Sequence, residues 1–266
     1  MLRDQTVELV GISSAVIVGE VEARRPLAFI TPDQAMKLRL DLLDCEYPPV
    51  PAFGKDPAVK GWPRFTYRAP SEGALKEWQT LADGMATNTG IACGRIRVID
   101  LDIDDHVLCL KAQEIIKEEL GTDLPCRVGR WPRVALFARQ LGLPRQTIRR
   151  DYQLGKVEYL GDNGHVIVHG IHPDTGKAYY WVGDPLWEIP KDSLPTITRE
   201  QENRIGPKLA ALLGGLKKGG IVQGTSTVVG LSGLIPDGHR NFYLKEKLHL
   251  AVAKAKSQEE LQEEAE

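Results

Sequence analysis

The spacing of apolar positions predicts helices and strands along the first part of the chain. Leucines recur at helical intervals over 31–46 and again, with a tryptophan, over 71–81. Each of these segments opens on a side chain that can cap a helix, namely Thr31, with Gln34 in a capping-box position, and Ser71. We therefore expect two amphipathic helices here, separated by a Pro- and Gly-rich stretch.

β-Branched residues mark the next elements. The stretch 96–104 is rich in them and predicts a strand, and a helix is expected over 106–120 with Gly121 as its C-cap. The run VALFA (134–138) predicts a second strand. The segment 156–171 alternates on both sides of a Gly-Asp-Asn-Gly turn, so we expect a β-hairpin there.

The character of the sequence changes near residue 200. Frequent glycines in a weakly periodic stretch predict a linker over 201–235, and the segment 236–266 is expected to be helical. The remainder divides into an N-terminal extension (1–27) and a main domain (28–200). The length of 266 residues suffices for one well-filled α/β core, or for one large and one small domain.

Composition restricts the function and the compartment. Lys and Arg total 34 against 36 Asp and Glu, a formal net charge of −2, so any binding site for anions must be local. The 4 cysteines form no C-x-x-C pair, which argues against a disulfide framework or a Cys-based zinc site. Apolar runs are short and the N-terminus lacks the order of a signal peptide. We expect a cytoplasmic protein with no membrane association.

Acidic residues alternate with apolar residues along the strand expected over 96–104. Alternate residues of a strand share a face, so Asp100, Asp102 and Asp104 share one face. Crowded carboxylates repel, and a divalent cation relieves the repulsion; oxygen ligands suit Mg²⁺ or Mn²⁺. The alternative is a solvated strand end whose acids cap the next helix, a role that fits Asp104 best.

An arginine-rich stretch, residues 127–150, follows. It contains no Asp, Glu or Lys, and the forked guanidinium group suits phosphate or carboxylate. Nucleotidyl transfer requires acids that bind metal ions and arginines that bind the phosphates of the substrate. The alternative is a solvated basic face that pairs with nearby acids. The residues are Arg127, Arg130, Arg133, Arg139, Arg145, Arg149 and Arg150.

The same stretch carries a competing motif. Ala138, Gly142 and Ile148 have the spacing of a helix-turn-helix, in which a small residue, a turn glycine and an apolar anchor recur. This interpretation requires a helix over 137–141, where the sequence VALF favours a strand.

Four stretches occur together in an order typical of one family. They are PPVPAFGKDPAVKGW (48–62), GIACGRIRVIDLDID (90–104), CRVGRWPRVALFAR (126–139) and KVEYLGDNGHVIVHGIHPDTGKAYYW (156–181). In this order they resemble the N-terminal primase–polymerase (prim-pol) domain of the archaeo-eukaryotic primase superfamily, in its phage and plasmid replication versions. The resemblance spans about residues 40–200. It implies an α/β (α+β) catalytic core, a mixed or antiparallel sheet with flanking helices, and a small C-terminal helical segment.

The resemblance assigns catalytic and metal-binding roles to three acids. Asp100 and Asp102 match the family's Asp-x-Asp motif, and Glu158 stands where the family more often has Asp. Together they would hold two divalent ions, Mg²⁺ or Mn²⁺. The family's second motif normally supplies a His that contacts the incoming nucleotide, and the alignment places Arg133 near that position. Arginine can contact phosphate in its place.

Further residues of the resemblance belong to nucleotide binding. Arg127 and Arg133 would stabilise the triphosphate. Lys55, with Lys60, lies in a loop that resembles a substrate-proximal segment, with a solvated lysine as the alternative. His172, in the turn His-Pro-Asp-Thr-Gly, either reaches the nucleotide or packs against neighbouring aromatic residues.

The implied reaction is DNA-templated nucleotidyl transfer in phage or plasmid replication, in the cytoplasm of a bacterial host. A primer 3′-hydroxyl attacks the α-phosphate of a nucleoside triphosphate and releases pyrophosphate. The implied partners are nucleoside triphosphates and a single-stranded template or a primer–template. The sequence has no G-x-x-x-x-G-K-[S/T] motif. A replicative helicase is then a separate protein, or this chain is part of a longer ancestral arrangement.

Two alternatives stay open from the sequence. The first is a catalytically degraded prim-pol-like or helix-turn-helix replication protein that binds origin DNA through 138–149. The second is another metal-dependent phosphotransferase or a glycosyltransferase that uses Asp-x-Asp.

Overall fold

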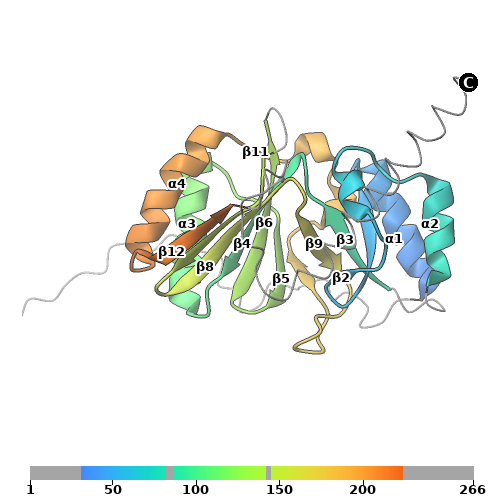
Figure 1. Cartoon of the computed structure of the whole chain (residues 1–266), viewed down its shortest axis with the longest axis horizontal. Helices are drawn as coiled ribbons and strands as arrows, with labels where there is room; N and C mark the ends of the chain where they lie inside the picture. Colours follow the sequence, from blue (N-terminus) through green and yellow to red (C-terminus); the bar gives the residue numbers. More distant parts are fainter. Residues whose placement is uncertain (1–30, 82–86, 142–144, 224–266) are drawn as a thin grey trace, which may run out of the picture. The chain divides into compact units, whose positions relative to one another are not determined.

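The structure is a computed structural model that describes residues 31–81, 87–141 and 145–223. Within these ranges the strands form one eight-stranded and one four-stranded sheet, with helices packed against both (Figure 1). The α/β fold with flanking helices is confirmed. The N-terminal extension (1–27) and the C-terminal segment (236–266) lie outside the described residues. None of the described helices is long and apolar enough to cross a membrane.

The larger sheet is mixed. Its strands follow the order β10-β5-β6-β4-β8-β7-β12 through antiparallel pairs, and the short β11 joins β6 in parallel. The strands are β4 (Ile96–Asp102), β5 (Cys126–Arg130), β6 (Arg133–Gln140), β7 (Ile148–Tyr152), β8 (Gly155–Leu160), β10 (Tyr180–Val182), β11 (Thr196–Ile197) and β12 (Leu216–Gln223).

The smaller sheet is antiparallel, in the order β2-β1-β3-β9. Helices α1 and α2 lie side by side against it, joined through a shared apolar cluster (Figure 1). Both helices begin as predicted, at the caps Thr31 and Ser71. The elements are α1 (Pro32–Asp44), β1 (Pro49–Phe53), β2 (Asp56–Pro57), the 3₁₀ helix η1 (Trp62–Thr66), α2 (Glu72–Gln79), β3 (Asn88–Ala92) and β9 (His165–His169).

The two sheets are connected by two chain segments that run together. β3 pairs with β9 in the smaller sheet and β4 pairs with β8 in the larger one. The predicted hairpin over 156–171 is therefore wrong, because β8 and β9 belong to different sheets. The turn between them hydrogen-bonds to the β3–β4 turn, where the Cys93 amide donates to the Gly164 carbonyl at 2.9 Å. Period-2 alternation shows that a run is a strand but does not identify its partner.

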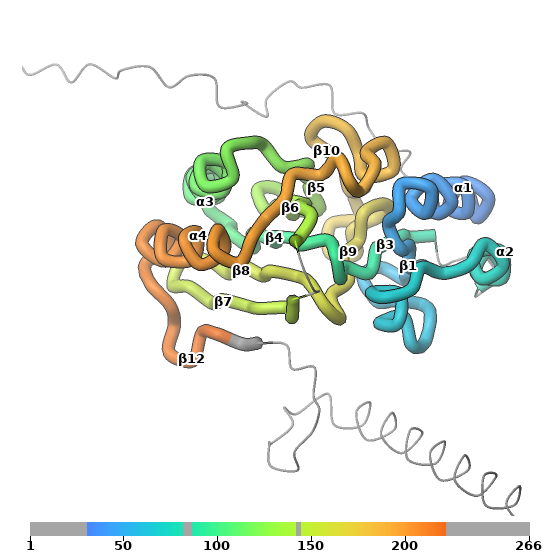
Figure 2. The backbone as a smooth tube through the Cα atoms, turned by 90° about the horizontal axis from the view of Figure 1, so that it is seen from above, coloured from blue at the N-terminus to red at the C-terminus, as the bar shows by residue number. Residues whose placement is uncertain are grey.

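Helices α3 (His106–Leu120) and α4 (Arg199–Leu212) lie side by side along one face of the larger sheet (Figures 1 and 2). From β4, Ile99 and Leu101 are fully buried in the cluster that these helices complete. Helix α3 has the predicted bounds, with the Asp105 carboxylate accepting the Leu108 amide and Gly121 closing the helix at φ 73°. Ile99 and Leu101 of β4 therefore face the helices, whereas Ile96 and Val98, at the alternate positions, are buried in a second cluster.

The predicted linker over 201–235 is wrong for its described part, which contains most of α4 and all of β12. Helix α4 has a capping box at its start and buries Ile205 and Leu209 against the core. Gly206 and Pro207 interrupt the helical pattern in the sequence. These two residues mask the helical spacing of Ile205 and Leu209 in the sequence. The spacing becomes apparent only when the helix packs on the sheet.

A buried ionic contact joins α4 to the sheet. Arg97 of β4 is fully buried, and its Nε and Nη2 donate to the Glu202 carboxylate at 2.7 and 3.2 Å. Arg145 adds a contact to the same carboxylate at 3.1 Å. A buried charge without a partner is costly, so these three groups fix the position of α4.

Glu202→Ala tests this attachment. Removing the carboxylate leaves Arg97 buried without its partner, and we expect the free energy of unfolding to fall by about 3–5 kcal/mol. Glu200→Ala, an exposed position in the same helical turn, is the control and changes stability far less. Urea unfolding followed by circular dichroism measures both. An equal loss in the two variants would show that the ionic contact does not hold the helix.

Candidate active site

Three carboxylates meet on the face of the larger sheet that is turned away from α3 and α4. Asp100 of β4 is the direct cross-strand partner of Glu158 of β8, and Asp102 lies two residues further along the same face. One oxygen atom of each acid lies within 4.8 Å of an oxygen of the other two. The structure thus brings together the three acids that the sequence analysis assigned to a metal site.

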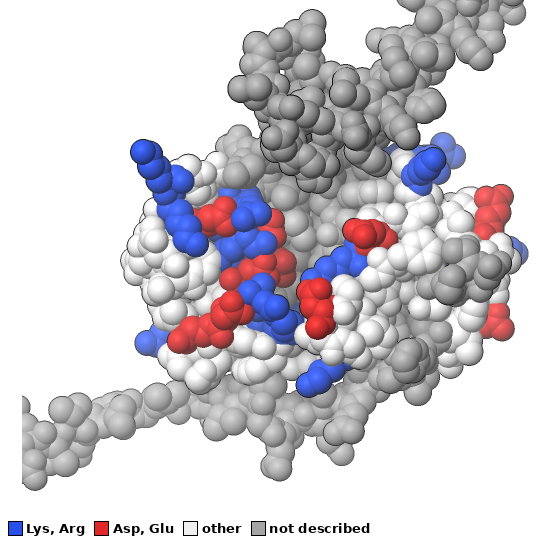
Figure 3. All heavy atoms as spheres, turned by 60° about the horizontal axis from the view of Figure 1, so that its bottom comes forward, with Lys and Arg blue, Asp and Glu red and all other residues white. Residues whose placement is uncertain are grey.

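The acids line a cavity of about 360 Å³. Basic side chains share this cavity, so opposite charges are concentrated in one place. Figure 3 shows the same mixture on the surface, where acidic and basic side chains gather side by side. The basic lining residues are Lys55, Arg127, Arg130, Arg133 and Lys156.

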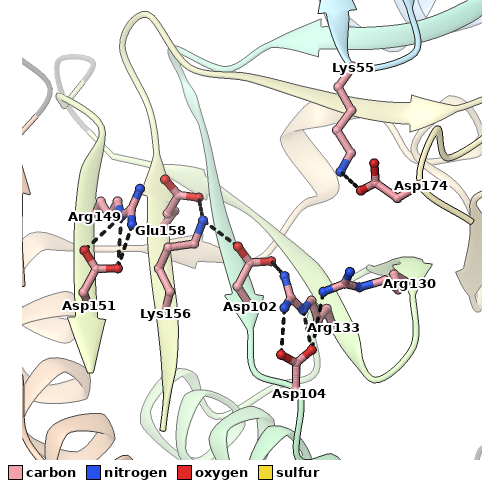
Figure 4. A network of polar contacts seen from close by, with 10 residues as sticks. All are labelled: Lys55, Asp102, Asp104, Arg130, Arg133, Arg149, Asp151, Lys156, Glu158 and Asp174. Carbon is pink, nitrogen blue, oxygen red and sulfur yellow. Dashed lines mark hydrogen bonds and ion pairs between the residues drawn. The ribbon is translucent and has the colours of Figure 1, made fainter. Parts of the chain in front are cut away.

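Lys156 lies in the middle of the acidic group. Its Nζ is 2.5 Å from an oxygen of Asp102 and 2.7 Å from an oxygen of Glu158 (Figure 4). The sequence analysis missed this lysine. The signal was present, because Lys156 stands two residues before Glu158 and two-residue spacing on a strand places side chains on one face.

Arg133 approaches the acids from the other side. Its Nε and Nη2 each donate to the Asp104 carboxylate at 2.8 Å, and its Nη1 donates to Asp102 at 3.3 Å (Figure 4). This forked hydrogen bond lowers the pKa of Asp104. Asp104 lies beyond the end of β4 and outside the three-acid group. The helix cap expected of it is provided by Asp105.

Asp100 is the most perturbed of the acids. Burial raises its pKa to about 6, and the neighbouring charges of Asp102 and Glu158 add to the rise. Arg127 and Lys156 oppose the rise without cancelling it. Burial therefore disfavours the ionised form of Asp100, and a cation bound beside this carboxylate would relieve that cost.

Arg127 belongs to a cluster beside the acids. Its guanidinium carbon lies 4.7 Å from the ring centre of Tyr179, and the His172 ring lies 5.3 Å from the same ring. Gly129 makes this packing possible, because a Cβ there would meet Tyr179 at 2.5 Å. The Nε of Arg127 is buried and has no hydrogen-bond partner among the described residues.

The remaining predicted nucleotide-binding residues have different settings. Lys55 lines the cavity and pairs with Asp174 at 3.2 Å. His172 is buried, and its Nδ1 accepts the Asp174 amide at 3.2 Å. Lys60 is exposed and is not part of the cavity lining.

The arginine-rich stretch does not form one surface. Arg127, Arg130 and Arg133 line the cavity. Arg139 instead pairs with Asp192, and Arg150 lies over the Tyr159 ring. The expected single cluster is therefore not formed: the first three members line the cavity, and phosphate binding by them stays a prediction.

The helix-turn-helix interpretation is wrong. It needs a helix over 137–141, but residues 133–140 form β6, which pairs with the acidic strand β4. Ile148, the expected anchor of a recognition helix, begins β7. Gly142 lies outside the described residues. The strand propensity of VALF prevails because both neighbours of β6 offer it hydrogen bonds along its length.

Fold and site together define an α/β domain with an acidic group on two paired central strands. The model of one protein family, the N-terminal domain of bifunctional DNA primase/polymerases (Prim-Pol), matches residues 40–196, more than half of the chain. The chain belongs to this family, as its four sequence stretches indicated. A search of curated proteins finds no match.

The raised pKa of Asp100 predicts a pH dependence of stability in the presence of a chelator. The folded chain holds this proton more tightly than the unfolded chain does. The free energy of unfolding attributable to Asp100 therefore falls as the pH rises from about 4 to about 6, and is constant above that. Asp100→Asn removes this component. Relative to the wild type, its stability should rise across this window.

Urea unfolding at several pH values measures the difference between the two proteins. Asp104→Asn is the control, because Asp104 has a lowered pKa and its substitution does not remove the fall between about pH 4 and 6. A wild-type stability that rises over this window relative to Asp100→Asn would contradict the assignment.

Proposed function

We propose that this chain is a metal-dependent DNA primase/polymerase that carries out template-directed nucleotidyl transfer. The observation that carries the proposal is the group formed by Asp100, Asp102 and Glu158, with oxygen atoms within 4.8 Å, in a member of the prim-pol family. The donor set fits the proposed ions, because an all-oxygen set of carboxylates suits Mg²⁺ or Mn²⁺. Such ions, when bound, neutralise phosphate charge and activate the attacking hydroxyl.

The chain's own residues supply binding and orientation. Arg127 lines the cavity beside the acids, held against Tyr179, and its guanidinium group is of the type that donates to phosphate oxygens. Lys55 and Arg130 add positive charge to the same cavity. The acids would thus hold the ions, and the basic lining would orient the triphosphate of the nucleotide.

Arg133 has a more restricted role in this proposal. Its guanidinium already makes hydrogen bonds with Asp104 and Asp102, so contact with a triphosphate requires it to exchange those partners. Arg127 needs no such exchange. We therefore assign the main triphosphate contact to Arg127 and keep Arg133 and His172 as additional nucleotide-binding residues.

The proposed substrates are nucleoside triphosphates and a single-stranded DNA template or primer–template. A replicative helicase, as a separate protein, would provide the template strand. Replication of a phage or plasmid is the proposed setting.

Asp102→Asn tests the catalytic assignment. The substitution keeps the volume and removes a negatively charged ligand, so nucleotide incorporation should fall by more than about 100-fold. Asp105→Asn is the matched control, since Asn caps a helix as well as Asp does. Labelled incorporation on a single-stranded template, with and without primer, measures both. DNA binding without incorporation in the wild type would favour the catalytically degraded alternative.

Arg127→Met tests the triphosphate contact. Methionine keeps apolar packing against Tyr179 but removes the donors, and we expect nucleotide binding to weaken by about 1.5–3 kcal/mol. Arg139→Met, which removes an arginine outside the cavity, should leave nucleotide affinity unchanged. Isothermal titration with a nucleoside triphosphate gives both values. Equal losses of affinity in the two variants would show that the overall charge, and not a contact made by Arg127, determines nucleotide binding.

A further inference from the structure

Lys156 occupies the space between two of the proposed metal ligands. Its ammonium group contacts Asp102 at 2.5 Å and Glu158 at 2.7 Å, and its side chain is only 24% exposed. Figure 4 shows the ammonium between the two carboxylates, with Arg133 on the far side of Asp102. A side chain of the chain itself therefore provides positive charge to these two acids.

A metal ion held by the three acids would share the Asp102 and Glu158 carboxylates with this ammonium group. Mg²⁺ binds carboxylate oxygen at about 2.0–2.1 Å, and Nζ already lies within hydrogen-bond distance of two of the three acids that would hold such an ion. Both carboxylate oxygens already accept charge-assisted hydrogen bonds from Lys156. Binding of such an ion requires those contacts to be given up.

The contacts of Lys156 are not needed to join the strands. β4 and β8 are already paired along their length, from Val98 opposite Leu160 to Asp102 opposite Lys156. The ammonium group adds charge neutralisation in a place where burial disfavours ionised carboxylates. This need disappears once a divalent ion is bound.

We propose that Lys156 is a built-in counter-cation that metal binding displaces from Asp102 and Glu158. The inference rests on the proposed function, because it takes the three acids as metal ligands. Lys156 stabilises the acidic group before metal arrives and weakens the affinity of the site for free metal. The displaced ammonium group stays within a cavity whose other cations are placed for triphosphate.

Titration with Mn²⁺ alone, followed by the electron paramagnetic resonance of the free ion, tests the inference without an activity assay. Lys156→Met removes the competing cation, and we expect Mn²⁺ to bind about 10-fold more tightly or better. Lys55→Met is the matched control. It removes the same charge from the same cavity, but Lys55 contacts Asp174 instead of the three acids. Its Mn²⁺ affinity should stay within about two-fold of the wild type.

Thermal unfolding gives a second readout. In chelator, Lys156→Met should melt below the wild type, because its acids lack their counter-ion. In excess Mn²⁺ the difference should vanish or reverse, because the metal replaces the ammonium group. Lys156→Gln serves if the methionine variant does not fold.

The outcomes separate the two proposals. Unchanged or weaker Mn²⁺ binding by Lys156→Met, or tightening matched by Lys55→Met, would overturn the counter-cation role. Asp102→Asn, carried through the same titration, should lose Mn²⁺ affinity. If the wild type binds Mn²⁺ no better than Asp102→Asn, the metal site itself fails, and with it the proposed function.

Discussion

The pairing of β4 with β8 is the constraint on which the site depends. Their register places Asp100 opposite Glu158 and fixes Asp102 and Lys156 as the next pair on the same face. A shift of one residue in either strand would send its carboxylates into the apolar cluster under α3 and α4. The burial of Ile99 and Leu101 prevents that shift, so the core determines the geometry of the acids.

Strand β4 presents charged side chains on both of its faces, in different surroundings. On one face, Arg97 is buried and neutralised by Glu202 of α4. On the other, Asp102 pairs with Lys156 and Arg133, whereas burial and the neighbouring carboxylates raise the pKa of Asp100. The buried pair stabilises the attachment of α4, whereas burial on the other face disfavours the ionised form of Asp100. The Arg97–Glu202 pair thus marks the face of β4 that packs against α4, and the carboxylates mark the face that carries the candidate site.

The basic residues around the acids also divide into two kinds. Lys156 and Arg133 are engaged with carboxylates, and under the proposed function binding of metal or nucleotide would rearrange them. Arg127 has an aromatic support and an unused donor. The site therefore combines acids and bases that largely pair with one another, and under the proposed function incoming cations and phosphates would replace these internal partners.

The sequence by itself determined the local elements and the ligand types. Helix caps at Thr31, Ser71 and Gly121 and the alternation around Asp100 depend on neighbouring residues, and local rules describe them. Family resemblance added Glu158. Only the tertiary structure decided strand partners, and so the failure of the predicted hairpin, the place of α4 and the position of Lys156. These features depend on contacts between residues that are distant in sequence. Burial of side chains stabilises such contacts, and no local sequence pattern shows which segments will pack together.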